Sequence, residues 1–395
     1  MTRCRSSHLR FGHFVSFVAA GIMLIACLLS APATTLGASE KSSANTSDWP
    51  LPRGDAGSSG ATTIVLPDDL SVIWEYKADE AIETTPAVVG NRVFLSDVMG
   101  RLYAVDRKTG KEIWKKNYDT GFLAAPAIQD DRMVIGDVEG NLYALNVQDG
   151  KEIWKQSTDG EISGAAAFHG ENVLVTSQDG KLYCFDAVTG KPAWVYQTDD
   201  QIRCSPTLAG NLTFLGGCDG QLHIVDVNTG KAVGKPLPLG GPTGSTPAVA
   251  GDDAILPIMD GAVLRFDWKK QTEQWRYEDE ERSQEYRSSA AVKGDFAIVT
   301  SQYKQVDAIS IATGKRLWRY TLRRRADASP VIAGDDVWIA STDGRLIRLA
   351  LADGQEKWQY EIKGSFLAAP AIAGDQLFIA DDEGVLRCFG KVAGK

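Results

Sequence analysis

Short apolar runs, each about four to seven residues long, alternate with turn-forming residues along most of this chain. One unit contains runs near residues 86–89, 92–97, 101–106 and 111–114, separated by Gly90-Asn91, Gly100 and Thr109-Gly110. The runs are rich in β-branched and aromatic residues, and each is too short for a helix. Many are apolar at consecutive positions, as in strands that are covered on both faces. The pattern predicts four strands joined by tight turns.

This unit recurs about every 40 residues and carries a tryptophan near its end, at Trp74, Trp114, Trp154, Trp194, Trp275, Trp318 and Trp358, with Gly234 in the remaining tryptophan position. Asp-Gly turns recur between the second and third strands, which favours antiparallel hairpins. Four-stranded units at this period predict a β-propeller, because one meander cannot bury its apolar faces alone. Eight first strands are expected, starting at Pro86, Pro126, Ala166, Pro206, Pro247, Ala290, Pro330 and Pro370.

The two ends of the repeat array predict how the ring closes. The last unit stops after its third strand, and an unpaired strand, residues 72–76, precedes the first unit. We expect this N-terminal strand to complete the eighth blade, because pairing removes the open sheet edges. The fold class is therefore predicted as all-β, an eight-bladed β-propeller of four-stranded antiparallel blades over residues 70–395.

The sequence Ala104-x-Asp106-x-x-Thr109-Gly110-Lys111-x-x-Trp114 is repeated at 144–154 and 184–194. It resembles the tryptophan-docking motif of the pyrroloquinoline-quinone-type propeller repeat, a superfamily that includes quinoprotein dehydrogenases and BamB-type lipoproteins of outer-membrane assembly. The resemblance implies that each tryptophan stacks between blades against a Thr-Gly-Lys turn. Gly234 in blade four and Gln271-Thr272 in blade five depart from the motif, and we expect each departure to weaken one docking contact.

Residues 1–38 have the features of an export signal: three arginines, an apolar run from Phe14 to Leu29, and small residues after it. In an alternative interpretation, Leu24-Ile25-Ala26-Cys27 is a lipoprotein signal and Cys27 becomes the lipidated first residue. Residues 39–69 are expected to form a flexible lead-in, Ser/Thr/Gly-rich over 39–59. Within it, Trp49-Pro50-x-x-Arg53-Gly54-x-x-Gly57 is similar to a segment that precedes propellers of envelope proteins in this group.

Composition indicates a well-packed, acidic protein outside the cytoplasm. Hydrophobic residues make up 44% of the chain, and the formal net charge of −9 becomes −12 without Arg3, Arg5 and Arg10. Such a charge disfavours nucleic acid and anionic membrane surfaces as partners, so a membrane would be reached only through a lipid anchor. We expect a monomer. Cys204 and Cys218 flank one hairpin and could form a disulfide, which an oxidising compartment allows without requiring it.

The chain has few candidates for catalysis or cofactor binding. His169 and His223 have no recognisable partner in the sequence, and the common nucleophile, zinc-protease and phosphate-loop motifs are absent. The quinoprotein enzymes of the resembled superfamily carry adjacent cysteines and a calcium site, whereas this chain has no Cys-Cys pair. We therefore expect no catalytic residue, no metal site and no cofactor; a bound quinone is disfavoured, and calcium at the acidic turns has no specific support.

Loops that differ between blades are the best candidates for binding a partner. The loop before each first strand and the hairpin between the second and third strands should emerge on one side of the ring. Two acidic residues and one arginine are expected near the channel mouth, at Glu83, Asp327 and Arg203. Blades six and seven contribute an aromatic and basic cluster, comprising Arg287, Tyr303, Lys304, Arg323, Arg324 and Arg325, beside the acidic run 278–281.

These observations predict a non-enzymatic, exported propeller that acts as a protein-interaction scaffold in the periplasm or cell envelope, similar to BamB-type assembly factors. Fold alone does not fix function. The alternatives are a quinone-dependent oxidoreductase and a propeller that binds a small molecule or glycan at the charged mouth.

Overall fold

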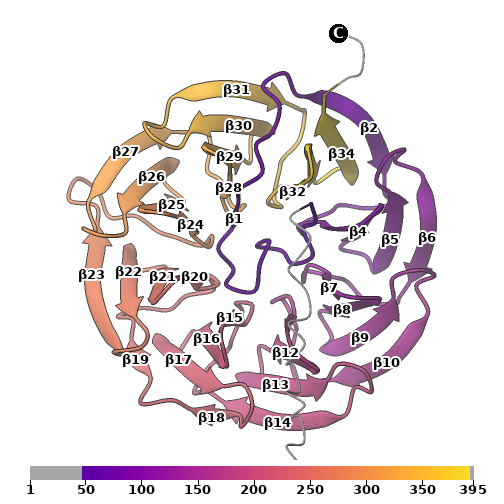
Figure 1. Cartoon of the computed structure of the whole chain (residues 1–395), viewed down its shortest axis with the longest axis horizontal. Coiled ribbons are helices and arrows are strands. Elements are labelled where there is room, and N and C mark those ends of the chain that lie inside the picture. Colours follow the sequence, from indigo (N-terminus) through magenta and orange to yellow (C-terminus); the bar gives the residue numbers. More distant parts are fainter. Residues whose placement is uncertain (1–46, 392–395) are drawn as a thin grey trace, which may run out of the picture. The chain divides into compact units, whose positions relative to one another are not determined.

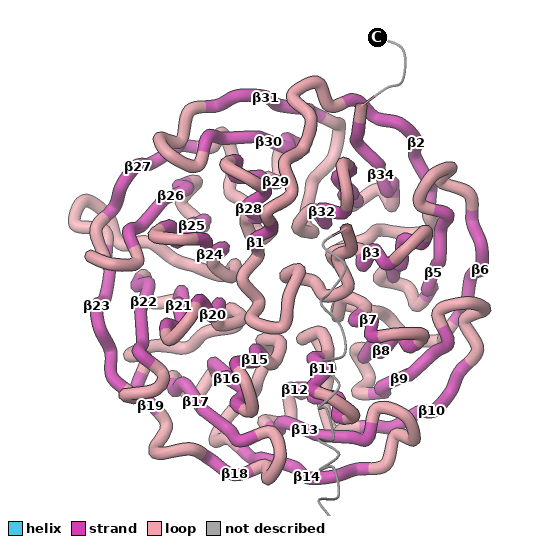
Figure 2. Tube along the Cα trace, in the orientation of Figure 1, coloured by secondary structure: helices cyan, strands magenta, loops and turns pink. Residues whose placement is uncertain are grey.

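Eight β-sheets are arranged in a ring in the computed structural model, which describes residues 47–391 (Figure 1). All regular elements in this range are strands, joined by turns and short loops (Figure 2). None of these residues belongs to a helix long and apolar enough to span a membrane. The proposed export signal, Cys27 included, and residues 39–46 of the expected lead-in lie outside the described residues.

The first four blades follow one another along the chain, and each runs from the channel outward. Blade 1 comprises β3 (Ala87–Val89), β4 (Arg92–Ser96), β5 (Arg101–Asp106) and β6 (Glu112–Asn117). Blade 2 comprises β7 (Ala127–Gln129), β8 (Arg132–Gly136), β9 (Asn141–Asn146) and β10 (Glu152–Ser157). Blade 3 comprises β11 (Ala167–His169), β12 (Asn172–Thr176), β13 (Lys181–Asp186) and β14 (Pro192–Gln197). Blade 4 comprises β15 (Thr207–Ala209), β16 (Leu212–Gly216), β17 (Gln221–Asp226) and two short outer strands, β18 (Lys231–Ala232) and β19 (Leu237–Pro238).

The remaining blades complete the ring. Blade 5 comprises β20 (Ala248–Ala250), β21 (Asp253–Pro257), β22 (Ala262–Asp267) and β23 (Thr272–Glu278). Blade 6 comprises β24 (Ala291–Lys293), β25 (Phe296–Thr300), β26 (Gln305–Ser310) and β27 (Arg316–Thr321). Blade 7 comprises β28 (Val331–Ala333), β29 (Asp336–Ala340), β30 (Arg345–Ala350) and β31 (Glu356–Glu361), and blade 8 contributes β32 (Ala371–Ala373), β33 (Gln376–Ala380) and β34 (Val385–Gly390).

The N-terminal strand β2 (Ser71–Lys77) closes the ring as the sequence predicts. It pairs antiparallel with β34, and the register places Trp74 opposite Cys388 and Tyr76 opposite Leu386. An ion pair between Arg387 and Glu75, 2.9 Å apart, joins the same two strands. The prediction of an eight-bladed, all-β propeller closed by this strand is confirmed.

The core lies between neighbouring blades. Phe94 and Ala104 of blade 1, for example, belong to one buried cluster with Met133 and Tyr143 of blade 2. The middle strands are buried at nearly every position because a neighbouring sheet covers each face, whereas the outer strand β6 is exposed at most positions and buries only its tryptophan. This difference explains why the apolar runs of the sequence are continuous in the middle of each unit.

Six tryptophans of the repeat connect one blade to the next. Their indole Nε1 atoms donate to a backbone carbonyl at 2.7–3.2 Å, as in Trp74 to Arg107 and Trp275 to Ile311; the other four are Trp114, Trp154, Trp194 and Trp318. The ring lies against the turn glycine of the next blade: a Cβ at Gly110 would come within 2.7 Å of Trp74. Gly110 also has a φ of +70°, which favours glycine. Glycine is therefore required here both by the space beside the ring and by the backbone conformation.

The two departures from the motif, at Gly234 and Gln271, lie against each other in a single contact between blades. The expectation of two weakened contacts is therefore wrong, because the larger side chain of one residue fills the space left by the other. Gln271 of blade 5 occupies the turn-glycine position that would receive a tryptophan from blade 4, and its side chain lies over Gly234. Its Nε2 donates to the carbonyl of Val233 at 3.0 Å. Trp275 still makes its own contact with blade 6. A glutamine and a glycine therefore replace the usual glycine and tryptophan at the interface of blades 4 and 5.

Residues 49–62, here called the inner segment, lie inside the ring, where the indigo part of the chain crosses the middle of Figure 1. Backbone hydrogen bonds join this segment to the innermost strands of six blades, at Val88, Ile128, Leu208, Val249, Val292 and Ile332. Strand β1 (Ala61–Thr62) pairs in parallel with β28, and Trp49 is only 1% exposed. The expectation of a flexible lead-in is therefore wrong for these residues, which are part of the folded ring.

Candidate interaction site on the loop face

The loops that precede the first strands and the hairpins between the second and third strands lie together on one side of the ring, here called the loop face. In every blade the second residue of the hairpin donates its backbone N–H to a carbonyl of the preceding loop. Val98 donates to Ala81 at 3.1 Å in blade 1, and Gln302 donates to Glu285 at 2.9 Å in blade 6. This repeated bond fixes the position of each loop, so side chains that vary between blades are held on a rigid base.

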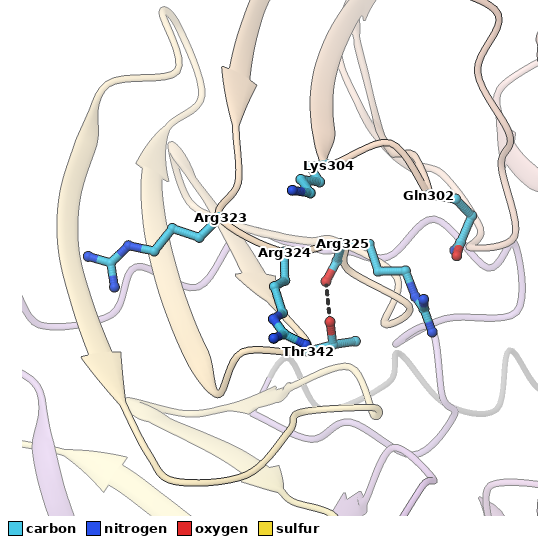
Figure 3. Close-up of a pocket in the computed structure, with 6 residues that line it drawn as sticks. All are labelled: Gln302, Lys304, Arg323, Arg324, Arg325 and Thr342. Carbon is cyan, nitrogen blue, oxygen red and sulfur yellow. Dashed lines mark hydrogen bonds between the residues drawn. The ribbon is translucent and has the colours of Figure 1, made fainter.

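A pocket of about 390 Å³ on this face is lined by Gln302, Lys304, Arg323, Arg324, Arg325 and Thr342, and we call it the basic pocket (Figure 3). Its residues come from the blade 6 hairpin, the loop between blades 6 and 7, and the blade 7 hairpin. Thr342 anchors the middle loop, because its backbone N–H and its hydroxyl both donate to the carbonyl of Arg325 at 3.0 Å. Four of the six lining residues are thus cations.

Two of these cations are neutralised by neighbouring carboxylates and two are not. Arg325 Nε lies 2.9 Å from a carboxylate oxygen of Asp327, and Arg323 lies 3.3 Å from Glu361. Lys304 and Arg324 are exposed and form no ion pair within residues 47–391. The net positive charge of the basic pocket therefore comes from Lys304 and Arg324.

Lys304 has an unusual backbone conformation. Its φ is +70°, and the equivalent hairpin position is a glycine in the other seven blades, at Gly100, Gly140, Gly180, Gly220, Gly261, Gly344 and Gly384. A side chain in this left-handed region costs roughly 1–2 kcal/mol. Strain of this kind in an ordered turn is a reason to look for a function of the side chain.

The other members of the predicted cluster lie outside the lining of the basic pocket. Arg287 forms an ion pair of 2.6 Å with Glu285, and Tyr303 lies under the guanidinium of Arg282, whose Cζ is 4.3 Å from the ring centroid. In the neighbouring acidic run, Asp279 is buried and bonded to Arg319, so it is part of the internal structure. Adjacency in sequence did not reveal these side-chain directions.

The channel mouth on the loop face contains two of the three charges that the sequence placed there. Glu83 and Asp327 line a cavity of about 180 Å³ whose lining also includes Pro52 and Arg53 of the inner segment. Asp327 accepts from Gln302 at 2.9 Å, so the basic pocket and the mouth share a residue. Arg203 bonds to Gln201 and is not part of this lining. Arg53, Gln302 and Thr342 were missed as site residues because their positions depend on contacts between blades.

The family profile described as outer membrane protein assembly factor BamB matches residues 58–163, 138–234 and 236–395. These matches cover most of the chain. The chain belongs to the BamB family. A comparison with curated proteins found no match.

Solved structures with similar folds include BamB from Moraxella catarrhalis, with a TM-score of 0.72 and 21% identity over 83% of this chain and 99% of that one. Quinohemoprotein alcohol dehydrogenase from Comamonas testosteroni has a TM-score of 0.76 and 15% identity over 88% and 82% of the two chains. A computationally designed protein, Ika8, gives a TM-score of 0.72 at 15% identity, covering 80% of this chain and 98% of the designed one. At these identities the solved structures show a shared fold.

The remaining polar candidates of this BamB-family chain have internal roles. Cys204 and Cys218 are free thiols, not a disulfide. Burial raises the pKa of Cys204 to about 12, which makes it a poor nucleophile. His223, expected to lack a partner, contacts Asp219 at 2.8 Å and the Tyr196 hydroxyl at 2.9 Å. Residues 47–391 contain no group of three or more His, Cys, Asp or Glu arranged to hold a metal ion.

Proposed function

We propose that this BamB-family propeller is a non-catalytic scaffold, exported to the periplasm or cell envelope, that binds a partner protein on its loop face. The basic pocket is the binding site, and an acidic segment of the partner is its ligand. The observation that carries the proposal is the pair of unneutralised cations, Lys304 and Arg324, held on hydrogen-bonded loops. Membership of a family described as an outer membrane protein assembly factor supports a role in the envelope.

The charge distribution favours a specific partner over nonspecific association. The chain as a whole has a formal net charge of −9, so acidic proteins are repelled from most of its surface. A local cluster of cations then selects a partner whose acidic residues match its position, and complementary charge of this kind contributes mainly to specificity and association rate. Binding should weaken as salt rises, because exposed charges are screened within about 8 Å at physiological ionic strength.

The inner segment supports a non-catalytic role over a quinone enzyme. The chain's own backbone is bonded to the innermost strands of six blades within the channel. The mouth cavity that remains measures about 180 Å³, whereas cofactor and small-molecule sites usually measure roughly 300–1,000 Å³. Absorbance spectra of the purified chain after incubation with quinone and calcium test this point. A stoichiometric bound quinone would contradict the scaffold proposal.

The partner site can be tested by crosslinking in intact cells. A photoreactive amino acid at position 303, an exposed residue next to Lys304 in the same hairpin, should attach to one envelope protein. The double variant Lys304→Glu, Arg324→Glu, carrying the same photoreactive residue, should lose that partner. Neither residue forms an ion pair with another residue of 47–391, so the fold should be retained. The matched control Lys191→Glu, Lys231→Glu makes the same change in net charge at exposed positions that are distant in sequence from the basic pocket. Equal recovery of the partner with both variants would refute the site.

A further inference from the structure

The cavity at the channel mouth, here called the cup, is a second candidate site, independent of the proposed scaffold role. Pro52 and Arg53 of the inner segment contribute to it, together with residues just before the first strands of several blades. Its lining includes four hydroxyl side chains from consecutive blades: Ser205, Thr246, Ser289 and Ser329. The corresponding residue of blade 1, Thr85, also lines the cup, whereas those of blades 2, 3 and 8 are Ala125, Ala165 and Ala369. The hydroxyls of blades 4 to 7 therefore form one continuous arc.

These hydroxyls are oriented by a chain of bonds between blades. Each one accepts a backbone N–H from the preceding blade: Ser205 from Ala165 at 2.9 Å, Thr246 from Ser205 at 3.1 Å, Ser289 from Thr246 at 2.9 Å, and Ser329 from Ser289 at 3.0 Å. None of the four makes any other hydrogen bond within residues 47–391. A hydroxyl that accepts in this way still has its hydrogen to donate. The arc therefore offers four O–H donors.

Arg53 brings a buried positive charge to the same part of the cup. Its side chain is about 5% exposed. Nη1 donates to the carbonyl of Pro330 at 2.9 Å and Nη2 to the carbonyl of Ala290 at 2.8 Å. Pro330 and Ala290 directly follow Ser329 and Ser289 in the chain, so the guanidinium lies beside the hydroxyl arc.

This charge has no ion-pair partner among residues 47–391. Both bonded acceptors are neutral carbonyls, Arg53 forms no ion pair with a described carboxylate, and its Nε is buried without a partner within residues 47–391. Burial lowers the pKa of Arg53 to about 10, with a smaller opposing effect from Asp55. A buried charge that lacks an opposite charge is unfavourable. An anion in the cup would remove this cost.

We propose that the cup binds the carboxylate group of a small monoanion, held by Arg53 and by the hydroxyls of Ser205, Thr246, Ser289 and Ser329. A guanidinium and several O–H donors match the two oxygens of a carboxylate. The volume of about 180 Å³ is that of about six water molecules at roughly 30 Å³ each, so the ligand is a short carboxylic acid.

The charges at the rim favour a monoanion over a dianion. Glu83 is exposed and forms no ion pair within residues 47–391, whereas Asp327 is neutralised by Arg325. Glu83 therefore adds an unpaired negative charge to the rim, and Arg53 is the cation in the cup lining that has no ion-pair partner among residues 47–391. Arg53 can compensate one added negative charge, whereas a second negative charge would find no cation and would be repelled by Glu83. At about pH 8, where phosphate is mainly a dianion, phosphate should therefore bind more weakly than acetate.

Calorimetric titration of the full chain with sodium acetate tests the proposal, with sodium chloride at equal ionic strength and sodium phosphate as comparisons. We expect saturable acetate binding at one site per chain and at least tenfold weaker binding of chloride and phosphate. An acidic peptide that binds under these conditions while acetate does not would overturn the assignment of a small ligand. Equal heats from acetate and chloride would overturn it as well.

Two variants locate the site. Arg53→Met should abolish acetate binding, but Arg53 also connects blades 6 and 7, so this variant could fold poorly. The second variant, Ser289→Ala with Ser329→Ala, introduces a residue that three other blades already carry at this position, and it should weaken acetate binding at least tenfold. Ser163→Ala, a hydroxyl change on the loop face outside the cup lining, is the matched control. Unchanged acetate affinity in the double alanine variant would refute the cup as the site.

Discussion

Replacement of Lys304 by glycine should make the protein more stable and at the same time weaken its binding of the partner. Lys304 holds a φ of +70° in a hairpin where seven blades have glycine at φ values between +68° and +98°. Its backbone N–H bonds to Ser301 at 3.2 Å and its carbonyl to Leu322 N at 2.8 Å, and glycine keeps both bonds. The side chain is exposed, and it forms no ion pair with the described part of the chain that the substitution would remove.

The expected size of the effect follows from two opposing contributions. Relief of the left-handed conformation contributes roughly 1–2 kcal/mol in favour of glycine. Glycine gives the unfolded chain more conformational freedom, which removes about 0.5–1 kcal/mol of this gain. The variant Lys304→Gly should therefore unfold with a free energy about 0.5–1 kcal/mol higher than that of the wild type.

Urea unfolding and partner binding, measured on the same preparations, check this prediction. Lys304→Ala serves as the control, since it removes the charge but keeps a Cβ at positive φ; we expect wild-type stability and the same loss of binding. The reverse change in the neighbouring hairpin, Gly344→Lys, should be destabilising, because a Cβ there would lie 2.5 Å from the carbonyl oxygen of Ile362. The reasoning is refuted if the Lys304→Gly variant is less stable than the wild type or binds the partner normally. In either case, partner binding does not explain why a lysine stands at this strained position.

Two further predictions concern the inner segment and the turns. Gly60→Ala should lower the unfolding free energy by about 2 kcal/mol or more, because a Cβ at this position of φ +64° would overlap the guanidinium of Arg53. The control is Gly90→Ala, which also has a positive φ but has open space around it. This control should lower the unfolding free energy by less. Asp106 accepts from the hydroxyl and the backbone N–H of Thr109, which lowers the pKa of its carboxyl. Because the pKa is lowered in the folded protein, this stabilisation is present above about pH 4 and is lost as the pH falls below that value. The variant Asp106→Asn should therefore unfold with a free energy that depends less on pH between about 5 and 3. An unchanged pH dependence would contradict the assignment.

The blades and their closure could be predicted from the sequence because the signals are local and repeated eight times. Each strand lies within a few residues of its partner, and the turn between them carries the glycine that its φ requires, as at Gly100 and Gly110. The strand that pairs with β34 was recognised because one unit lacked an outer strand. These inferences needed only the period, the apolar pattern and the turn chemistry.

The inner segment could not be predicted in the same way. Its order comes from backbone hydrogen bonds to six blades that are up to about 270 residues away in the chain. Its serine, threonine and glycine content, taken alone, is typical of a flexible linker. The signal that could have indicated burial is Trp49 with closely spaced glycines: Gly54 is needed because a Cβ would lie 2.9 Å from the Trp49 ring, and Gly60 accommodates Arg53.

The limits of sequence reasoning at the candidate site are clearest where two residues depart from the repeat in the same manner. Gln271 and Lys304 both stand where the repeat has glycine, and both adopt positive φ, +55° and +70°. The sequence marks them equally as departures. Gln271 covers Gly234 and donates to Val233, so its side chain serves the interface of blades 4 and 5. Lys304 makes no such contact and lines the basic pocket.

This difference predicts opposite responses to the same substitution. Gln271→Gly relieves a comparable backbone strain but loses a hydrogen bond, about 0.5–1.5 kcal/mol, and leaves the space above Gly234 unfilled. We expect a net destabilisation of about 1 kcal/mol, in contrast to the stabilisation expected for Lys304→Gly. Both are measured by urea unfolding under identical conditions. The two glycine variants could instead shift stability in the same direction. The internal contacts of Gln271 would then not distinguish its role from that of Lys304, and the argument for Lys304 as a binding residue would fail.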